Sequence, residues 1–248
     1  MLLKDGKTET LDPRCGLIPE EDPTAPHILS VPPPDGGIDL SHRELISKYR
    51  VKKFFDPLLN QGKWSACAGF GFAAFMEHEP RISSLGDDWA LEFYFRVQDN
   101  DQWPGSERPG SSPKSYGTSL AATLQTAKQE GLIESHCRAY TVEEVIRGIA
   151  YYGSAILGLI WTDGMMNPKA DGLSVPTGRS IGGHCTAGTF VNLHRNLIGG
   201  PNSWPDWNRI RGGYWVMDLD DFAKVFKNGE CAFAKKATTL NLTGVCNE

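Results

Sequence analysis

The sequence predicts an α+β fold of two lobes, a helical lobe followed by a β-rich lobe, with a cleft between them. Helix signals dominate the first half of the chain, whereas short apolar runs separated by Gly, Pro and Asn dominate the second half. Chains that separate helices and strands in this way form α+β arrangements. With 248 residues and 40% hydrophobic content, the chain is long and apolar enough for two lobes that share a cleft.

The N-terminal part differs in composition from the rest of the chain. Residues 1–40 are rich in Pro, Asp and Glu and contain a run of three prolines, which is typical of an extended arm. We therefore expect an arm over residues 1–40 and a globular domain over residues 41–248. Within this domain we expect the helical lobe at about 41–140 and the β-rich lobe at about 141–248. Whether the arm occupies the cleft or packs on the back of the domain stays open.

Helix signals occur in several segments of the chain up to residue 153. Residues Cys67–Glu79 are apolar nearly all round, which predicts a helix buried inside a lobe. Ser119–Glu130 predicts a second helix with Ser119 as its N-cap, and Thr141 with Glu144 forms a capping box for a third. Asp88–Val97 is aromatic-rich and fits a helix or a strand.

Strand-like runs follow these helices. They are apolar, short, and bounded by Gly, Pro and Asn clusters, which is the pattern of strands in a sheet. They lie at Ala155–Trp161, Cys185–Leu193, Gly213–Asp218 and Cys231–Ala234.

Composition argues against several classes of partner. The net charge is −5 and the chain has no basic stripe, so nucleic acid is not an expected partner. No run reaches the roughly 18 apolar residues that span a bilayer, so no membrane association is expected. Residues 1–7 lack the apolar core of a signal peptide. We expect a cytoplasmic or phage-associated protein whose oligomeric state the sequence leaves unknown.

The six cysteines do not form the patterns of a disulfide framework or a metal site. An even number permits disulfides, but a chain without a secretory signal is not expected to contain them. No Cys-x-x-Cys pair is present, which disfavours structural zinc. His184 and Cys185 are adjacent, but neighbours in a strand face opposite sides and so do not share a metal. We expect no metal and no cofactor.

Four residues have the types and the order that a thiol hydrolase needs. Cys67 opens the apolar helix, where the helix N-terminus favours the nucleophilic thiolate. His184 would accept and return the proton, and Asn202 would orient its imidazole ring. Gln61 lies 67 − 61 = 6 residues before the cysteine and would donate its side-chain N–H to the developing oxyanion, together with the backbone N–H of Cys67. These four are the candidate catalytic residues.

Neighbouring small and aromatic residues are candidate substrate contacts. Gly182 and Gly183 precede the histidine, and glycines at that place let a substrate backbone approach closely. Trp204 follows Asn202 by two residues and would cover the hydrogen bond between the histidine and the asparagine from water.

Taken together, these segments resemble the papain (C1-type) family of cysteine peptidases. The resemblance covers the oxyanion-glutamine and nucleophile segment, the histidine strand and the asparagine block of the family. The segments that carry it here are Asn60–Gly62 with Ser65–Cys67, Gly183–His184, and Asn202–Trp204. It extends from about residue 45 to residue 220.

The resemblance adds one site residue and a specific fold. Tyr116–Leu120 is similar to the glycine-bearing loop that lines the family's substrate cleft, which makes Gly117 a further candidate substrate contact. The implied fold has a helical left lobe that carries Cys67 on its central helix. An antiparallel, β-barrel-like right lobe would carry His184 and Asn202 across the cleft.

The chain also departs from the family's usual pattern. Trp64 stands where the family commonly has a disulfide-bonded cysteine, so that bridge cannot form. Ser65 replaces a glycine and Ala68 replaces a tryptophan, while Pro205 replaces the glycine after the Asn-Ser-Trp block. These departures suggest a divergent, non-secreted branch, such as bacterial or phage enzymes.

Three hypotheses about function follow. The first is a cysteine peptidase that cleaves peptide bonds in a polypeptide through an acyl-thioester on Cys67. The second is a catalytically inactive papain-like protein with a structural or binding role, for example in a phage particle. The third is a Cys–His hydrolase or transferase that acts on cell-wall peptides, since thioester chemistry serves hydrolysis and transfer alike.

Overall fold

The structure is a computed structural model that describes residues 12, 14–20, 22–23, 25–28, 58–81, 83–109 and 116–236. Its main helices and strands lie between residues 67 and 236. The helices are α2 (Cys67–Met76), α3 (Gly86–Asn100), α4 (Leu120–Gln129), α5 (Val142–Tyr152), α6 (Asp163–Met166) and α7 (Leu219–Phe226), with a 3-10 helix η2 (Arg209–Arg211). The strands are β1 (Ile133–Ala139), β2 (Ala155–Thr162), β3 (Ser180–Gly188), β4 (Phe190–Asn192), β5 (Leu197–Pro201), β6 (Tyr214–Asp218) and β7 (Glu230–Lys236).

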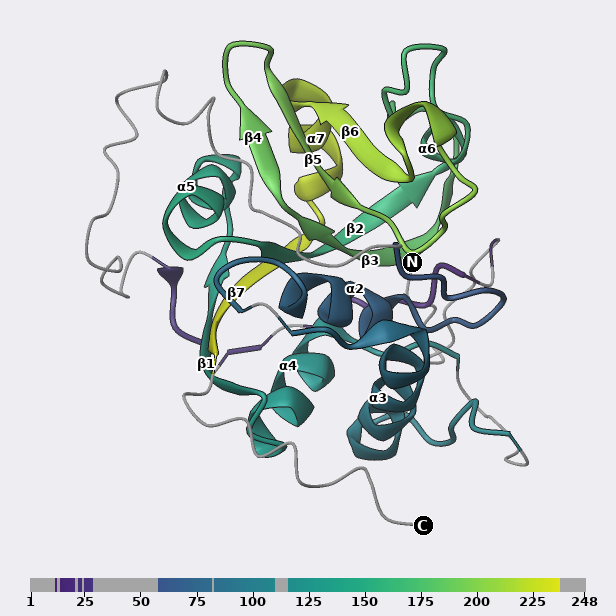
Figure 1. Cartoon of the computed structure of the whole chain (residues 1–248), viewed down its shortest axis with the longest axis vertical. Coiled ribbons are helices and arrows are strands. Elements are labelled where there is room, and N and C mark those ends of the chain that lie inside the picture. The colour runs from purple at the N-terminus through teal and green to yellow at the C-terminus, as the bar shows by residue number, and fades with distance from the viewer. Residues whose placement is uncertain are drawn as a thin grey trace.

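Two antiparallel sheets organise the molecule. One has four strands in the order β1-β7-β2-β3, and the other has three strands in the order β4-β5-β6. Helices α2, α3 and α4 lie together on one side of the four-stranded sheet, and the three-stranded sheet with α7 lies on the other side (Figure 1). Strand β1 falls within the range predicted for the helical lobe, yet it pairs with β7 at the far end of the described chain.

Helix α2 is buried nearly all round, as its sequence predicts. It packs between α3 and β3, and glycines permit the close approach on both sides. A Cβ on Gly69 would lie 2.5 Å from the Ala90 carbonyl oxygen, and a Cβ on Gly71 would lie 2.7 Å from the sulfur of Cys185. This packing fixes the helix whose first residue is Cys67.

The predicted helix starts are confirmed. Ser119 caps α4 by accepting a hydrogen bond from the backbone N–H of Ala122, and Thr141 with Glu144 forms the capping box of α5. Asp88–Val97, which fitted helix or strand, lies inside α3 with Phe93 buried. Burial of one face of this aromatic segment against α2 decides in favour of the helix.

The predicted strands are present, but the run predicted at Cys185–Leu193 is divided between β3 and β4, and β1 and β5 were not predicted. His184 was expected just before a strand that begins at Cys185, whereas β3 begins at Ser180 and contains the histidine. Gly182 and Gly183 have low strand propensity, so the sequence pattern did not predict a strand at these residues. In the sheet they pair with Trp161 and Ile160 of β2, so tertiary pairing overrides the local preference.

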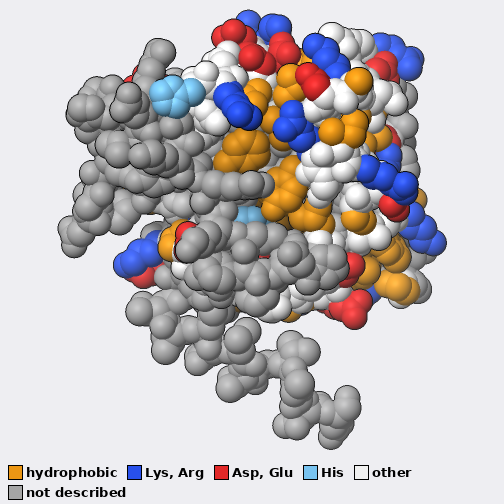
Figure 2. Space-filling view, turned by 45° about the horizontal axis from the view of Figure 1, so that its top comes forward, with side chains coloured by type: hydrophobic (Ala, Val, Ile, Leu, Met, Phe, Trp, Pro, Cys, Tyr) orange, Lys and Arg blue, Asp and Glu red, His pale blue; other side chains and the backbone are white. Residues whose placement is uncertain are grey.

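The surface carries both apolar and charged side chains. In the view of Figure 2, apolar side chains gather near the middle of the face, with Lys, Arg, Asp and Glu side chains around them. None of the helices within the described ranges is long and apolar enough to cross a membrane.

Candidate active site

Cys67 is the first residue of α2 and is fully buried. Burial raises the pKa of its thiol to about 11, although the backbone N–H groups of Cys185, Gly16 and Ala68 hydrogen-bond to the sulfur and oppose this shift. The amide of Ala68 belongs to the first turn of the helix, where free N–H groups favour a negative charge. The sulfur therefore has thiolate-stabilising groups in place, while its burial keeps it protonated.

His184, in the middle of β3, is held by Asn202, which directly follows β5. The imidazole Nε2 lies 2.8 Å from Asn202 Oδ1, and the backbone N–H of Ser203 donates to the same oxygen at 2.8 Å. Because that oxygen only accepts, Nε2 carries the proton and Nδ1 carries the lone pair. Nδ1 is buried and carries the lone pair, and the imidazole also interacts with the backbone of Arg14 in the N-terminal segment.

Aromatic rings enclose this histidine. The Trp204 ring lies over it, with ring centroids 4.3 Å apart, and the Trp161 ring meets its edge at 4.8 Å. Burial lowers the pKa of His184 to about 4, although the hydrogen bond that its imidazole donates to Asn202 opposes this shift. The imidazole is therefore neutral in this state, and Trp204 lies where the sequence predicted a cover. The sequence did not point to Trp161, which is part of an apolar strand.

The side chain of Gln61 is locked in one orientation. Its Oε1 accepts hydrogen bonds from Ser203 Oγ at 2.6 Å and from the indole N–H of Trp204 at 3.0 Å. Its Nε2 must then point the other way, where it donates to the Trp64 carbonyl at 2.8 Å and to the Arg14 carbonyl at 3.1 Å. The same two residues that follow Asn202 thus orient the glutamine.

Comparison with known proteins identifies the architecture. No family model and no curated protein matches the sequence. Among solved structures, xylellain, a cysteine protease from Xylella fastidiosa, matches with a TM-score of 0.58 at 12% identity, over 93% of this chain and 97% of that chain. This chain has a papain-like fold. The fold predicted from the sequence is therefore confirmed.

Two further structures are also similar, at lower scores. Procathepsin L 3 of Tenebrio molitor larval midgut has a TM-score of 0.48 at 9% identity, over 79% of this chain and 78% of that chain. Procathepsin L2 from the same source has a TM-score of 0.46 at 15% identity, over 89% of this chain and 78% of that chain. The assignment of the papain-like fold rests on xylellain. At these identities the comparisons establish the fold and not the activity.

Part of the N-terminal arm lies in the cleft of this papain-like fold. We call residues 14–20 the strap. The strap reaches the β-rich side through a hydrogen bond from the Leu17 N–H to the Gly183 carbonyl, at 3.0 Å. It reaches the helical side through two bonds with Thr118, whose N–H donates to Gly16 at 2.9 Å and whose carbonyl accepts from Ile18 at 2.9 Å. The strap therefore bridges both walls beside Cys67 and His184 and contributes to their burial.

Two of the glycines predicted to contact substrate, Gly117 and Gly183, contact the backbone of the strap. Gly117 has φ of +81°, and a Cβ there would lie 1.7 Å from the Gly16 carbonyl oxygen. A Cβ on Gly183 would lie 2.3 Å from the Leu17 carbonyl oxygen. Any larger residue would therefore push a bound backbone away. Gly182 has φ of +147° and pairs with Trp161, so it shapes the strand that presents Gly183.

A half-buried carboxylate, which the sequence did not reveal, connects α3 with the segments before α2 and α4. Glu107 accepts hydrogen bonds from the Tyr94 hydroxyl, from Ser65 and from the N–H of Gly117. Tyr94 in turn accepts from the Gly117 N–H at 2.9 Å. Burial raises the pKa of Glu107, although these bonds oppose the shift. Ser65, a departure from the family pattern, thus ties the segment before Cys67 to the glycine loop.

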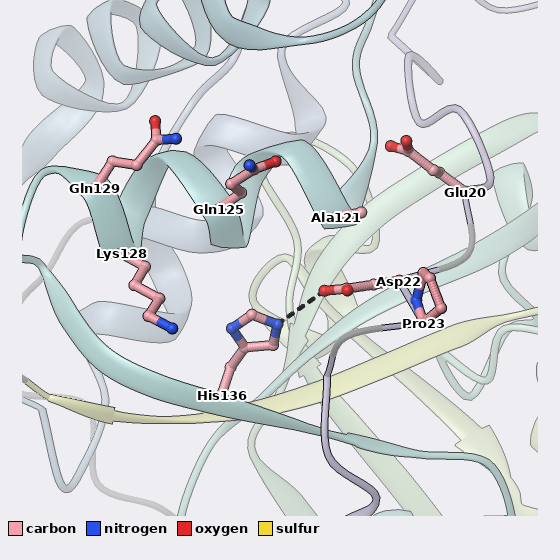
Figure 3. Close-up of a pocket in the computed structure, with 8 residues that line it drawn as sticks. All are labelled: Glu20, Asp22, Pro23, Ala121, Gln125, Lys128, Gln129 and His136. Atoms are coloured by element: carbon pink, nitrogen blue, oxygen red, sulfur yellow. Dashed lines mark hydrogen bonds and ion pairs between the residues drawn. The ribbon is translucent and has the colours of Figure 1, made fainter.

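One pocket lies away from the catalytic candidates. It has a volume of about 630 Å³ and lies between the strap end, α4 and β1 (Figure 3). His136 on β1 contacts Asp22 at 3.0 Å, and Lys128 reaches toward it from α4. This pocket contains no nucleophile and so is not the candidate active site. Among the described residues, no group of three or more His, Cys, Asp or Glu is arranged to hold a metal ion.

Proposed function

We propose that this chain is a cysteine peptidase that cleaves peptide bonds through an acyl-thioester on Cys67. The observation that carries the proposal is the hydrogen bond from the locked Gln61 amide to the Arg14 carbonyl. A peptide carbonyl therefore fits against the oxyanion donor in the cleft that holds Cys67 and His184. Polypeptide is the substrate class that fits this arrangement, since the cleft already accommodates a stretch of backbone through Gly183 and Thr118.

The chemistry follows from the roles of the side chains. His184 accepts the Cys67 proton at Nδ1, and the thiolate attacks the substrate carbonyl carbon. The oxyanion takes hydrogen bonds from Gln61 Nε2 and from the Cys67 backbone N–H. His184 then gives its proton to the leaving amine, which leaves an acyl-thioester. A water molecule, deprotonated by the same imidazole, hydrolyses the thioester and restores the thiol.

In the proposed enzyme, the strap holds the site in a resting state. Cys67 and His184 are both 0% exposed, which favours the neutral thiol and the neutral imidazole. Lifting the strap would admit solvent and substrate, lower the pKa of the thiol and raise the pKa of the imidazole. Turnover therefore requires displacement of the strap.

Coverage of Cys67 and His184 by the strap also favours one alternative function, an inactive papain-like protein. If the strap never leaves, the cleft is a structural element and the chain is an inactive papain-like protein. A test compares the native chain with Leu17→Asp, since Leu17 is 4% exposed and packs in the core beside Cys67. The same substitution at Ile210, which is 65% exposed, is the matched control.

The readouts are turnover of a fluorogenic peptide library and labelling of Cys67 by an epoxysuccinyl inhibitor. We expect Leu17→Asp to increase both, Ile210→Asp to change neither, and Cys67→Ala to abolish both. Equal turnover by Leu17→Asp proteins with and without Cys67 would reject the peptidase. Products that carry an added amine nucleophile would point to a transferase instead.

A further inference from the structure

A second thiol lies beside the proposed nucleophile. Cys15 is the strap residue between Arg14 and Gly16, and it is 2% exposed. Both of its neighbours are anchored at the site, since the Arg14 carbonyl accepts from Gln61 and the Gly16 N–H hydrogen-bonds to the Cys67 sulfur. Cys15 is therefore fixed at both ends within the catalytic part of the cleft.

The geometry places the Cys67 sulfur close to the backbone of Cys15. The Gly16 nitrogen and the Cys15 Cα are separated by two bonds, which is about 2.4 Å. Because that N–H hydrogen-bonds to the Cys67 sulfur, the sulfur lies within about 6 Å of the Cys15 Cα. Disulfides join residues whose Cα atoms are about 4.4–6.8 Å apart. In the closed structure Cys15 packs in a different apolar cluster from Cys67, so a bond between them requires the strap to shift and turn Cys15 toward the Cys67 sulfur. Both thiols are free in this structure.

Electrostatics agree with this placement. Burial raises the pKa of the Cys15 thiol, and negative charge on Cys67 raises the pKa of Cys15 further. The Cys15 thiol is thus close enough to Cys67 to sense its charge, as is Cys185.

The other described cysteines are held in regular structure. Cys185 lies on β3 with its sulfur directed at Gly71, one turn along α2 from Cys67. Cys137 lies on β1 and Cys231 on β7, in the strands farthest from β3. Among the described cysteines, Cys15 is the one on a segment that must move for substrate to enter.

We propose that Cys15 and Cys67 form a reversible disulfide that locks the strap over the cleft when the protein meets a small-molecule disulfide such as oxidised glutathione. The proposal rests on the function proposed above, in which Cys67 is the nucleophile and the strap opens. It adds a redox-controlled modification site to that function.

The exchange proceeds in two balanced steps. While the strap is open, the Cys67 thiolate attacks glutathione disulfide, forms a mixed disulfide and expels one glutathione thiolate. When the strap returns, the Cys15 thiolate attacks the Cys67 sulfur, forms the internal disulfide and expels the second glutathione thiolate. The two protein thiols give up their protons to the two glutathione molecules, and the electrons reduce the reagent. A reducing thiol reverses both steps.

The lock would also protect the nucleophile. A thiolate that stays exposed to oxidants proceeds to sulfinic and sulfonic acids, which are largely irreversible, whereas a disulfide can be reduced again. Oxidation to the disulfide would thus inactivate Cys67 reversibly instead of irreversibly.

The test uses the full chain, treated with oxidised or reduced glutathione, alkylated without reduction and digested. We expect the oxidised sample to lose about 2 Da in intact mass and to yield one cross-linked peptide pair that contains Cys15 and Cys67. Reduction with dithiothreitol should restore epoxysuccinyl labelling of Cys67. In Cys15→Ser and in Cys15→Ala, Cys67 should keep the glutathione adduct, whereas Cys137→Ala should still form the cross-link.

The possible outcomes separate the two proposals. A cross-link between Cys67 and Cys185, or a glutathione adduct that persists on Cys67 while Cys15 is present, overturns the disulfide. Mass mapping does not depend on turnover. A Cys15–Cys67 cross-link in a chain without peptidase activity would support the disulfide and reject the proposed function. Peptidase activity that depends on Cys67, without a cross-link to Cys15, would support the proposed function and reject the disulfide.

Discussion

Gln61 donates a hydrogen bond from its side-chain amide to the Arg14 carbonyl at 3.1 Å. The donor belongs to the segment before the nucleophile, and the acceptor belongs to the N-terminal strap. Ser203 and Trp204 fix the amide by bonding to its oxygen, so the donor is preorganised. The strap carbonyl therefore lies where the proposed mechanism needs the oxygen of a substrate.

Gln61→Ala removes this donor. Loss of one oxyanion donor costs about 10²–10³ in rate, so we expect kcat of the strap-loosened Leu17→Asp protein to fall by that factor with little change in KM. Steady-state kinetics on a fluorogenic peptide measure the effect. Asn60→Ala changes an exposed neighbour and is the control. An effect on KM alone would reduce Gln61 to a binding contact.

Asn202→Ala removes the acceptor that holds His184. General acid–base catalysis contributes about 10²–10⁴-fold, and a misoriented ring loses much of it, so kcat should fall by about 10²-fold or more. The buried Nε2–H also loses its partner, which costs about 1–3 kcal/mol of stability. Asn202→Asp keeps an acceptor at the same place and should recover part of kcat. If the aspartate variant is as slow as the alanine variant, the asparagine does more than position the ring.

Gly117→Ala should displace the strap. Its φ of +81° makes a side chain cost about 1–2 kcal/mol, and the added Cβ would overlap the Gly16 carbonyl. Gly131 has φ of +69° and open space around its Cβ position, so Gly131→Ala carries the backbone cost without the contact. We expect both variants to lose similar stability in urea, but only Gly117→Ala to label faster at Cys67. Equal labelling rates would mean that the strap does not depend on this contact.

Acid should weaken strap closure. The closed state lowers the pKa of His184 from 6.5 to about 4, so it favours the neutral ring. An opened or unfolded state then binds an extra proton between these pH values, and closure loses stability as pH falls from about 6.5 to about 4. On the alkaline side, Cys67 has its pKa raised from 9.0 to about 11, so closure weakens again as pH rises through that range.

Hydrogen exchange of residues 14–20 across pH 4–7 measures the acid limb. We expect the protection factors of these amides, which correct for the intrinsic exchange rate at each pH, to fall toward acid in the native chain and to lose much of this dependence in His184→Gln, which cannot take up the proton. An unchanged acid dependence in that variant would assign the effect to other groups.

The helices were predictable because their signals are local, whereas the papain-like fold followed from the resemblance of the Gln61–Cys67, His184 and Asn202 segments to the family. Caps at Ser119 and Thr141, and an apolar segment that starts at Cys67, are readable from neighbouring residues. The hydrogen bond between His184 and Asn202 also agrees with the order of residues along the chain. The roles of these residues in catalysis stay predictions, as do the lobe boundaries and the location of the protein in the cell.

The strap and the Glu107 contacts were not predictable, because their partners are distant in sequence. Leu17 pairs with Gly183 through backbone groups, which leave no mark in the pattern of side chains. Glu107 lies in a polar loop, where an acidic residue is ordinarily solvated. Only the assembled fold places its carboxylate against Tyr94 and Gly117.

The strap and the cysteine that it covers belong to one polypeptide. Closure is therefore an intramolecular event, and dilution of the protein does not weaken it. A free peptide with the strap sequence would compete against a tethered copy, whose effective concentration does not depend on the protein concentration. Resting and working molecules would thus coexist in a ratio that is independent of how much protein is present.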